Sequence, residues 1–214
     1  MESFRSRDHC QEKVINAFLD TYFFRKKFNY VHWITDSESQ YKGIDVIADG
    51  FYIDIKAQSS PRYINNPRGT FILELSFLDK NNNPLPGWFI NNRCATTMYS
   101  FVWINSAKVT DGVIKNPYDI EEVEVLLVDK IKLKEYINKW RSDDDLWMVS
   151  NRMRSIGMSR RECTLDGVHL SHTMNLVEKP TNLVVQKWLL EHFKNGHYIV
   201  TKTSINLVDK IKII

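Results

Sequence analysis

Two aspartates and a lysine flank a predicted hairpin turn in the segment GIDVIADGFYIDIKAQ, residues 43–58. Asp49-Gly50 is the dipeptide that best supplies the two positive-φ positions of a two-residue type I′ turn, so the β-prone runs on either side are expected to pair. Counting outward from that turn places Asp45 opposite Asp54. Cross-strand Cβ atoms at such positions lie about 4.5–5.5 Å apart and like charges there are destabilising, so the pairing predicts a cation between the two carboxylates.

Strand alternation places Asp54, Lys56 and Gln58 on one face of the second strand and the apolar residues between them on the other. Oxygen ligands without histidine or thiolate favour Mg²⁺ or Mn²⁺ over zinc. Lys56 is placed to orient or deprotonate a water that attacks a phosphorus atom, and the metal is expected to act as Lewis acid. The alternative is a surface hairpin in which the two acids and the lysine are solvated.

An amphipathic helix is predicted from about residue 8 to residue 28, ahead of the hairpin, with Asp8 as its N-cap. Glu12 falls on the face shared with Ile15 and Leu19, which is buried if the helix packs on the sheet. Its carboxylate is therefore a candidate metal ligand. Glu12 is equally explained as an ordinary acid in the first turn of a helix, and both interpretations stay open.

Further strands are predicted at residues 31–35, 70–77, 98–104 and 122–128, and a helix at residues 129–140. Strands interleaved with helices in this way are typical of the α/β class. The sequence therefore predicts a central mixed β-sheet flanked by helices.

The chain is expected to divide into three parts. Residues 1–140 form the predicted core, and residues 141–179, which have weak periodicity of either kind, form an insertion or subdomain. Residues 180–214 are a C-terminal extension, predicted to pack on the core as a helix closed by Gly196 and a last strand from Tyr198.

Composition narrows the class of protein. With 214 residues, 43% of them apolar, the chain is long enough to bury a sizeable core, and no apolar run reaches the roughly 18 residues of a membrane span. Its three cysteines, Cys10, Cys94 and Cys163, form no CxxC pair. A cytoplasmic protein without a membrane partner is expected.

Charge and aromatic residues bear on the partner. A net charge of +3 neither demands nor excludes nucleic acid. Arg62, Tyr63, Arg68, Trp88 and Arg93 combine cationic and aromatic side chains in predicted loops after the hairpin, a mixture suited to stacking on bases and gripping phosphates. The competing interpretation is a solvated basic surface with aromatic residues that belong to the core.

An aspartate, a short interval and then Asp-Ile-Lys on a strand resembles the PD-(D/E)xK nuclease superfamily, which includes restriction endonucleases and Holliday junction resolvases. The resemblance covers residues 8–104 in element order, with its motif at residues 45–58. Ile44 stands where the motif's name has proline. The resemblance implies a restriction-endonuclease-like core and a nuclease that depends on Mg²⁺ or Mn²⁺, with nucleic acid, expected to be DNA, as its partner.

The resemblance also implies roles for individual residues. Asp45 and Asp54 bind the metal, Glu12 and the backbone carbonyl of Ile55 are further candidate ligands, Lys56 positions the attacking water, and Gln58 contacts nucleic acid or backbone. A homodimer follows by analogy, because cutting both strands often uses two sites. The rival interpretation is a non-catalytic nucleic-acid-binding or assembly module that retains the fold.

Overall fold

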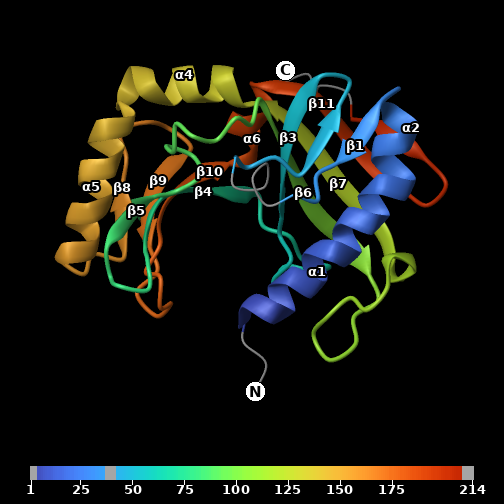
Figure 1. Cartoon of the computed structure of the whole chain (residues 1–214), viewed down its shortest axis with the longest axis horizontal. Coiled ribbons are helices and arrows are strands. Elements are labelled where there is room, and N and C mark those ends of the chain that lie inside the picture. Colours follow the sequence, from blue (N-terminus) through green and yellow to red (C-terminus); the bar gives the residue numbers. More distant parts are fainter. Residues whose placement is uncertain (1–3, 37–41, 209–214) are drawn as a thin grey trace. The chain divides into compact units, whose positions relative to one another are not determined.

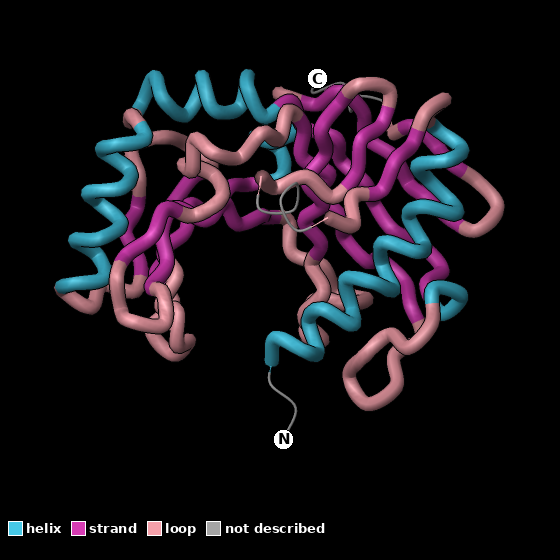
Figure 2. Tube along the Cα trace, in the orientation of Figure 1, coloured by secondary structure: helices cyan, strands magenta, loops and turns pink. Residues whose placement is uncertain are grey.

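The computed structural model describes residues 4–36 and 42–208 and groups the chain into two compact units (Figures 1 and 2). The first unit combines Met1–Arg68, Thr96–Asp129 and Lys194–Ile214, and the second combines Gly69–Ala95 and Lys130–Phe193. This division differs from the predicted boundaries after residues 140 and 179, because each unit is assembled from segments far apart in the sequence. Within the described ranges, no helix is long and apolar enough to cross a membrane.

A mixed sheet forms the centre of the first unit, so the predicted α/β class with helices flanking a mixed sheet is confirmed. Among the described residues its strands follow the order β1-β2-β3-β6-β7-β11-β12. Strands β3 and β6 are parallel, and the other neighbours are antiparallel. The strands are β1 Val31–Trp33, β2 Val46–Ala48, β3 Phe51–Ala57, β6 Met98–Ala107, β7 Ile120–Asp129, β11 Lys194–Thr201 and β12 Ile205–Leu207.

Helix α1, Phe4–Leu19, crosses this sheet (Figure 1). Ile15, Phe18 and Leu19 recur at helical spacing, are completely buried and share one apolar cluster with residues of β2, β3, β6 and β7. The predicted helix is therefore confirmed in position, but the prediction of Asp8 as its N-cap is wrong, because α1 already begins at Phe4.

The helical run continues through a π-helical turn, Asp20–Phe24, into α2, Arg25–Lys27. The wider turn changes the side-chain phase, and both Phe23 and Phe24 are buried. Asp20 fixes this turn to the first strand, because its carboxylate accepts a hydrogen bond of 2.6 Å from Trp33 Nε1. A 3₁₀ turn, Pro117–Asp119, precedes β7.

An antiparallel sheet organises the second unit, with the order β5-β4-β10-β9-β8 among the residues described there. Helix α5 packs against strands β4, β9 and β10. The elements are β4 Thr70–Leu78, β5 Pro84–Pro86, α4 Lys130–Trp140, α5 Asp143–Ser155, β8 Arg160–Glu162, β9 Val168–His172, β10 Thr181–Gln186 and α6 Lys187–Glu191.

The predicted C-terminal helix after residue 180 is largely wrong. Thr181–Gln186 is a strand, hydrogen-bonded to β4 on one side and β9 on the other, and the helix is limited to Lys187–Glu191. Gly196, predicted to close that helix, lies inside β11 at an irregularity in its pairing with β7. The predicted last strand is present as β11 and β12, and its end beyond residue 208 lies outside the described residues.

Candidate metal-binding site in the first unit

The β2–β3 hairpin turns at Asp49-Gly50 as predicted. Both residues have positive φ, 44° for Asp49 and 85° for Gly50, which is the backbone that a type I′ turn requires. Asp49 also ties the turn to the preceding segment, because its carboxylate accepts hydrogen bonds from the backbone N–H groups of Asn29 and Tyr30. The predicted register is confirmed at Ala48–Phe51, Ile47–Tyr52 and Val46–Ile53.

The backbone ladder ends before it reaches the two aspartates. The N–H of Asp45 donates to the carbonyl of Ile53 at 2.9 Å, and the N–H of Ile55 donates to Asp45 Oδ2 at 2.7 Å. The Asp45 side chain thus takes the place of a backbone acceptor and is held against β3. Asp45 and Asp54 are therefore not the predicted ladder pair, but the Asp45 carboxylate lies near enough to raise the pKa of Asp54.

Asp54 and Lys56 form an ion pair whose carboxylate is buried and whose lysine side chain is partly exposed. Lys56 Nζ lies 2.8 Å from Asp54 Oδ1, and the Asp54 side chain is 5% exposed. Burial is the largest influence on Asp54 and raises the pKa of its carboxyl to about 7; Asp45 adds to the rise and Lys56 opposes it. Burial is the largest single influence on Lys56 and lowers its pKa, but the combined attraction of Asp54, Asp45 and Glu12 outweighs burial, so the pKa is raised. Lys56 therefore stays charged at neutral pH.

Strand β6 supplies the apolar surroundings of this pair. In the parallel register Asp54 lies beside Tyr99 and Lys56 beside Phe101, and both aromatic side chains are completely buried with ring centroids 5.5 Å apart. On the opposite face of β3, Ile53 is part of the apolar core. The predicted alternation along β3 is confirmed, and the apolar neighbours explain why ionising Asp54 is costly.

Glu12 does not lie on the buried face of α1, so that prediction is wrong. Glu12 is exposed, while its neighbour Gln11 is 3% exposed and accepts a hydrogen bond from the N–H of Ile114 at 3.4 Å. Gln11 and Ile15 are four residues apart and lie on the buried face of α1. Glu12, one residue after Gln11, therefore points to a different side of the helix. The charge of Glu12 still acts at a distance and contributes to raising the pKa of Lys56.

Gln58 closes the loop that follows β3. Its Nε2 donates to the carbonyl of Arg68 at 3.1 Å, and its Oε1 accepts from the N–H of Arg68 at 2.9 Å. Trp103 Nε1 donates to the same carbonyl at 2.7 Å. The Arg68 guanidinium lies 4.7 Å from the centroid of the Tyr63 ring, so part of the predicted cationic and aromatic loop is held in one place. Trp88 and Arg93, from the same predicted group, belong to the second unit.

Gln58→Ala is expected to lower the free energy of unfolding by about 0.5–1.5 kcal/mol, because the exposed backbone groups of Arg68 exchange their side-chain partner for water. Urea denaturation measures this loss. A purely substrate-contacting role for Gln58 makes the opposite prediction, namely wild-type stability together with weaker binding or cleavage of nucleic acid.

Thr96 is a positioning residue that the sequence did not reveal. It is 5% exposed, and its hydroxyl donates to the carbonyl of Gly43 at 2.5 Å. This bond fixes the segment that leads into Asp45. Gly43 and Thr96 are 53 positions apart, so their spacing along the chain carries no signal.

The donor set suits a hard divalent cation with few protein ligands. No group of three or more His, Cys, Asp or Glu side chains able to hold a metal occurs in residues 4–36 and 42–208. Mg²⁺ characteristically keeps several waters and uses one or two carboxylates, which Asp45 and Asp54 provide. Burial and the nearby Asp45 charge both favour a proton on Asp54, and a cation beside the two carboxylates can replace that proton. The Ile55 carbonyl stays a predicted further ligand.

Comparison of the chain with protein-family models, curated proteins and solved structures gave no match. Its function is therefore inferred from the chemistry of the residues described above.

Proposed function

We propose that the protein is a metal-dependent nuclease that hydrolyses phosphodiester bonds, with Asp45 and Asp54 as metal ligands. The observation that carries the proposal is the position of Asp54, a buried carboxylate that is ion-paired with Lys56 and whose pKa is raised by burial and by the nearby Asp45. The buried Asp54 carboxylate, beside one ammonium group and a second, partly exposed carboxylate, stabilises the fold poorly, since burial disfavours its ionised form. Such an arrangement suits a site that gains a cation and an anionic substrate.

Lys56 acts as a charged hydrogen-bond donor in this proposal. Because its pKa is raised, it orients the attacking water and balances charge on the phosphate, and does not abstract a proton. Bound Mg²⁺ or Mn²⁺ would act as Lewis acid and lower the pKa of water. Asp45, held by the N–H of Ile55, keeps the ligand pair in place on β3.

The order of elements supports a restriction-endonuclease-like core. A long helix, α1, precedes the β2–β3 hairpin that carries the acids, and β6 then adds in parallel beside β3. This order agrees with the resemblance of the Asp45–Gln58 segment to the PD-(D/E)xK superfamily. DNA as substrate, Mg²⁺ as cofactor and a homodimer as assembly are part of the proposal on the same basis.

Cleavage of labelled DNA and RNA by the full chain tests the proposal. Linear, circular, branched and single-stranded DNA, and RNA, are incubated with Mg²⁺ or Mn²⁺ and compared with reactions in EDTA. We expect metal-dependent cutting that Asp45→Asn abolishes and that Asp111→Asn, at a side chain 84% exposed, leaves intact. Absence of cutting on every substrate would overturn the proposal, and tight metal-independent binding without cutting would indicate the non-catalytic module.

A further inference from the structure

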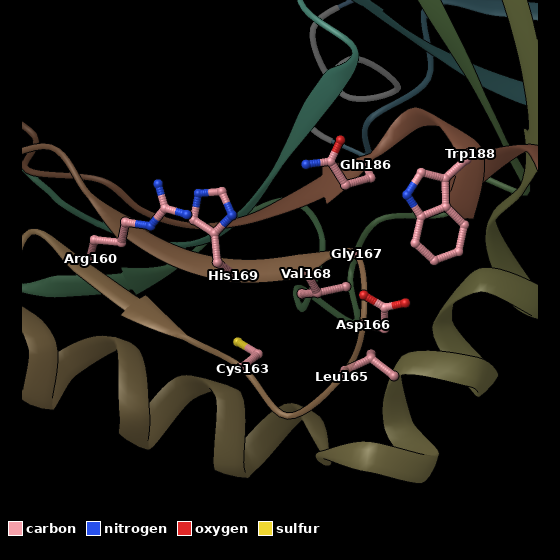
Figure 3. A pocket seen from close by; sticks show the side chains of 9 residues that line it. All are labelled: Arg160, Cys163, Leu165, Asp166, Gly167, Val168, His169, Gln186 and Trp188. Atoms are coloured by element: carbon pink, nitrogen blue, oxygen red, sulfur yellow. The ribbon is translucent and has the colours of Figure 1, made fainter.

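A polar pocket in the second unit lies at one end of strands β8, β9 and β10 (Figure 3). Its volume is about 340 Å³. Ligand-binding clefts typically measure roughly 300–1,000 Å³, so this pocket is sized for one small molecule or for one unit of a polymer. All residues that line it belong to the second unit.

The pocket has a cationic end and an aromatic end. Figure 3 shows Arg160 and His169 together at one end, and Trp188 with Asp166 at the other. Gln186 lies between the two ends in this view. Arg160 on β8, His169 on β9 and Gln186 on β10 project from the same face of the sheet by their register, while Val168 and Val185 project into the buried face.

Trp188 is placed as a stacking surface, not as a core residue. Trp188 is 45% exposed, and a Cβ added to Gly167 would lie 2.5 Å from its Cζ2 atom. Gly167 therefore lets the indole ring approach the backbone, and its φ of 74° also favours glycine. The N–H of Gln186 donates to the Gly167 carbonyl at 2.8 Å, which fixes this wall of the pocket.

We propose that this pocket binds one nucleotide unit, with the phosphate at Arg160 and the base at Trp188. A nucleotide carries an anionic group at one end and a flat ring with N–H donors at the other, which matches the two ends of the pocket. Arginine suits phosphate through its fork of donors, exposed tryptophan suits a base face, and the Asp166 carboxylate and Gln186 amide suit polar groups of the base edge. The expectation of nucleic acid rests on the proposed nuclease function, whereas the test below requires no cleavage.

Binding of adenosine 5′-monophosphate to the full chain, in EDTA, provides the test. The readout is the indole N–H resonance of Trp188 in proton–nitrogen correlation spectra, assigned by its loss in Trp188→Phe. We expect the nucleotide to shift this resonance, and adenosine and inorganic phosphate each to bind at least about tenfold more weakly than the nucleotide.

Charge and stacking are separated by two variants. Arg160→Gln is expected to weaken binding of the nucleotide about tenfold or more and to leave adenosine binding unchanged. Trp188→Ala is expected to weaken both, with Trp188→Phe retaining part of the affinity. The matched control is Arg152→Gln, at an exposed arginine on α5, which should bind like wild type.

The inference would be overturned if adenosine 5′-monophosphate at high concentration did not shift the Trp188 resonance. Equal affinities of Arg160→Gln and Arg152→Gln for this nucleotide would also overturn it. A DNA oligonucleotide distinguishes the source of the ligand. If Arg160→Gln binds the oligonucleotide more weakly than wild type does, the ligand of the pocket is a nucleotide within a nucleic-acid chain. If the variant loses affinity for the free nucleotide alone, the ligand is a free nucleotide. Nucleotide binding by a chain that cuts no substrate would overturn the nuclease proposal alone.

Discussion

Lys56→Met is expected to slow metal-dependent cleavage by about 10²–10³-fold, the usual cost of removing one donor that stabilises transition-state charge. Methionine keeps an unbranched side chain, shorter by one atom, and loses the ammonium group that lies 2.8 Å from Asp54. The water would lose its orienting donor and the phosphate its balancing charge. Initial rates at saturating Mg²⁺ measure the effect, with Lys108→Met, at an exposed lysine, as the control.

The same variant should also change stability, which separates a chemical role from loss of folding. Because Lys56 lowers the pKa of Asp54, its removal raises that pKa above 7 and Asp54 takes up a proton near neutral pH, so the loss should be smaller than the roughly 3–5 kcal/mol of a buried pair whose other partner stays charged. The double variant Asp54→Asn/Lys56→Met leaves neither charge unpaired and should recover much of that loss, yet it should stay inactive. Recovery of both stability and cleavage in the double variant would contradict a catalytic role for this pair.

The hairpin that carries the acids was predictable because its determinants are local. Asp49-Gly50 specifies a turn with two positive φ angles, and strand alternation then fixes which residues share a face. The position of the Asp45 side chain against β3 was not predictable in detail. It depends on the Ile55 N–H donating to the Asp45 carboxylate and not to a backbone carbonyl, and the spacing of residues does not predict which acceptor is used.

Elements that depend on distant partners were predicted less well. Thr181–Gln186 is a strand because β4 and β9 supply hydrogen bonds on both sides, and these partners are remote in the sequence. The start of α5 did have a local signal. Ser142 accepts a hydrogen bond from the N–H of Asp145 and is followed by three acids in the first turn, a pattern typical of a helix N-terminus.

The side chain of Asp54 should make the metal-free protein less stable as pH rises toward neutrality. Its pKa is about 7 in the folded protein against 3.8 for an unperturbed aspartate, so between these values the folded state holds a proton that the unfolded state lacks. The stabilisation is complete below about pH 4 and is lost as pH rises through 7. Each unit of pH in that window costs about 1.4 kcal/mol, which gives up to about 3 kcal/mol between pH 5 and pH 8.

Asp54→Asn should remove this dependence, because an amide does not titrate. The measurement is urea denaturation of both proteins in EDTA from pH 5 to pH 8. The slope of the free energy of unfolding against pH is compared between the two proteins, so that any pH-independent change caused by leaving Lys56 without its charged partner cancels. If Asp54 is also a metal ligand, Mg²⁺ must displace its proton. Mg²⁺ should therefore raise the melting temperature of wild type at pH 8, where this proton is already lost. It should have little effect on wild type at pH 5 or on Asp54→Asn at either pH. Parallel stability curves for the two proteins would show that burial does not shift Asp54, and equal stabilisation by Mg²⁺ at both pH values would place the metal elsewhere.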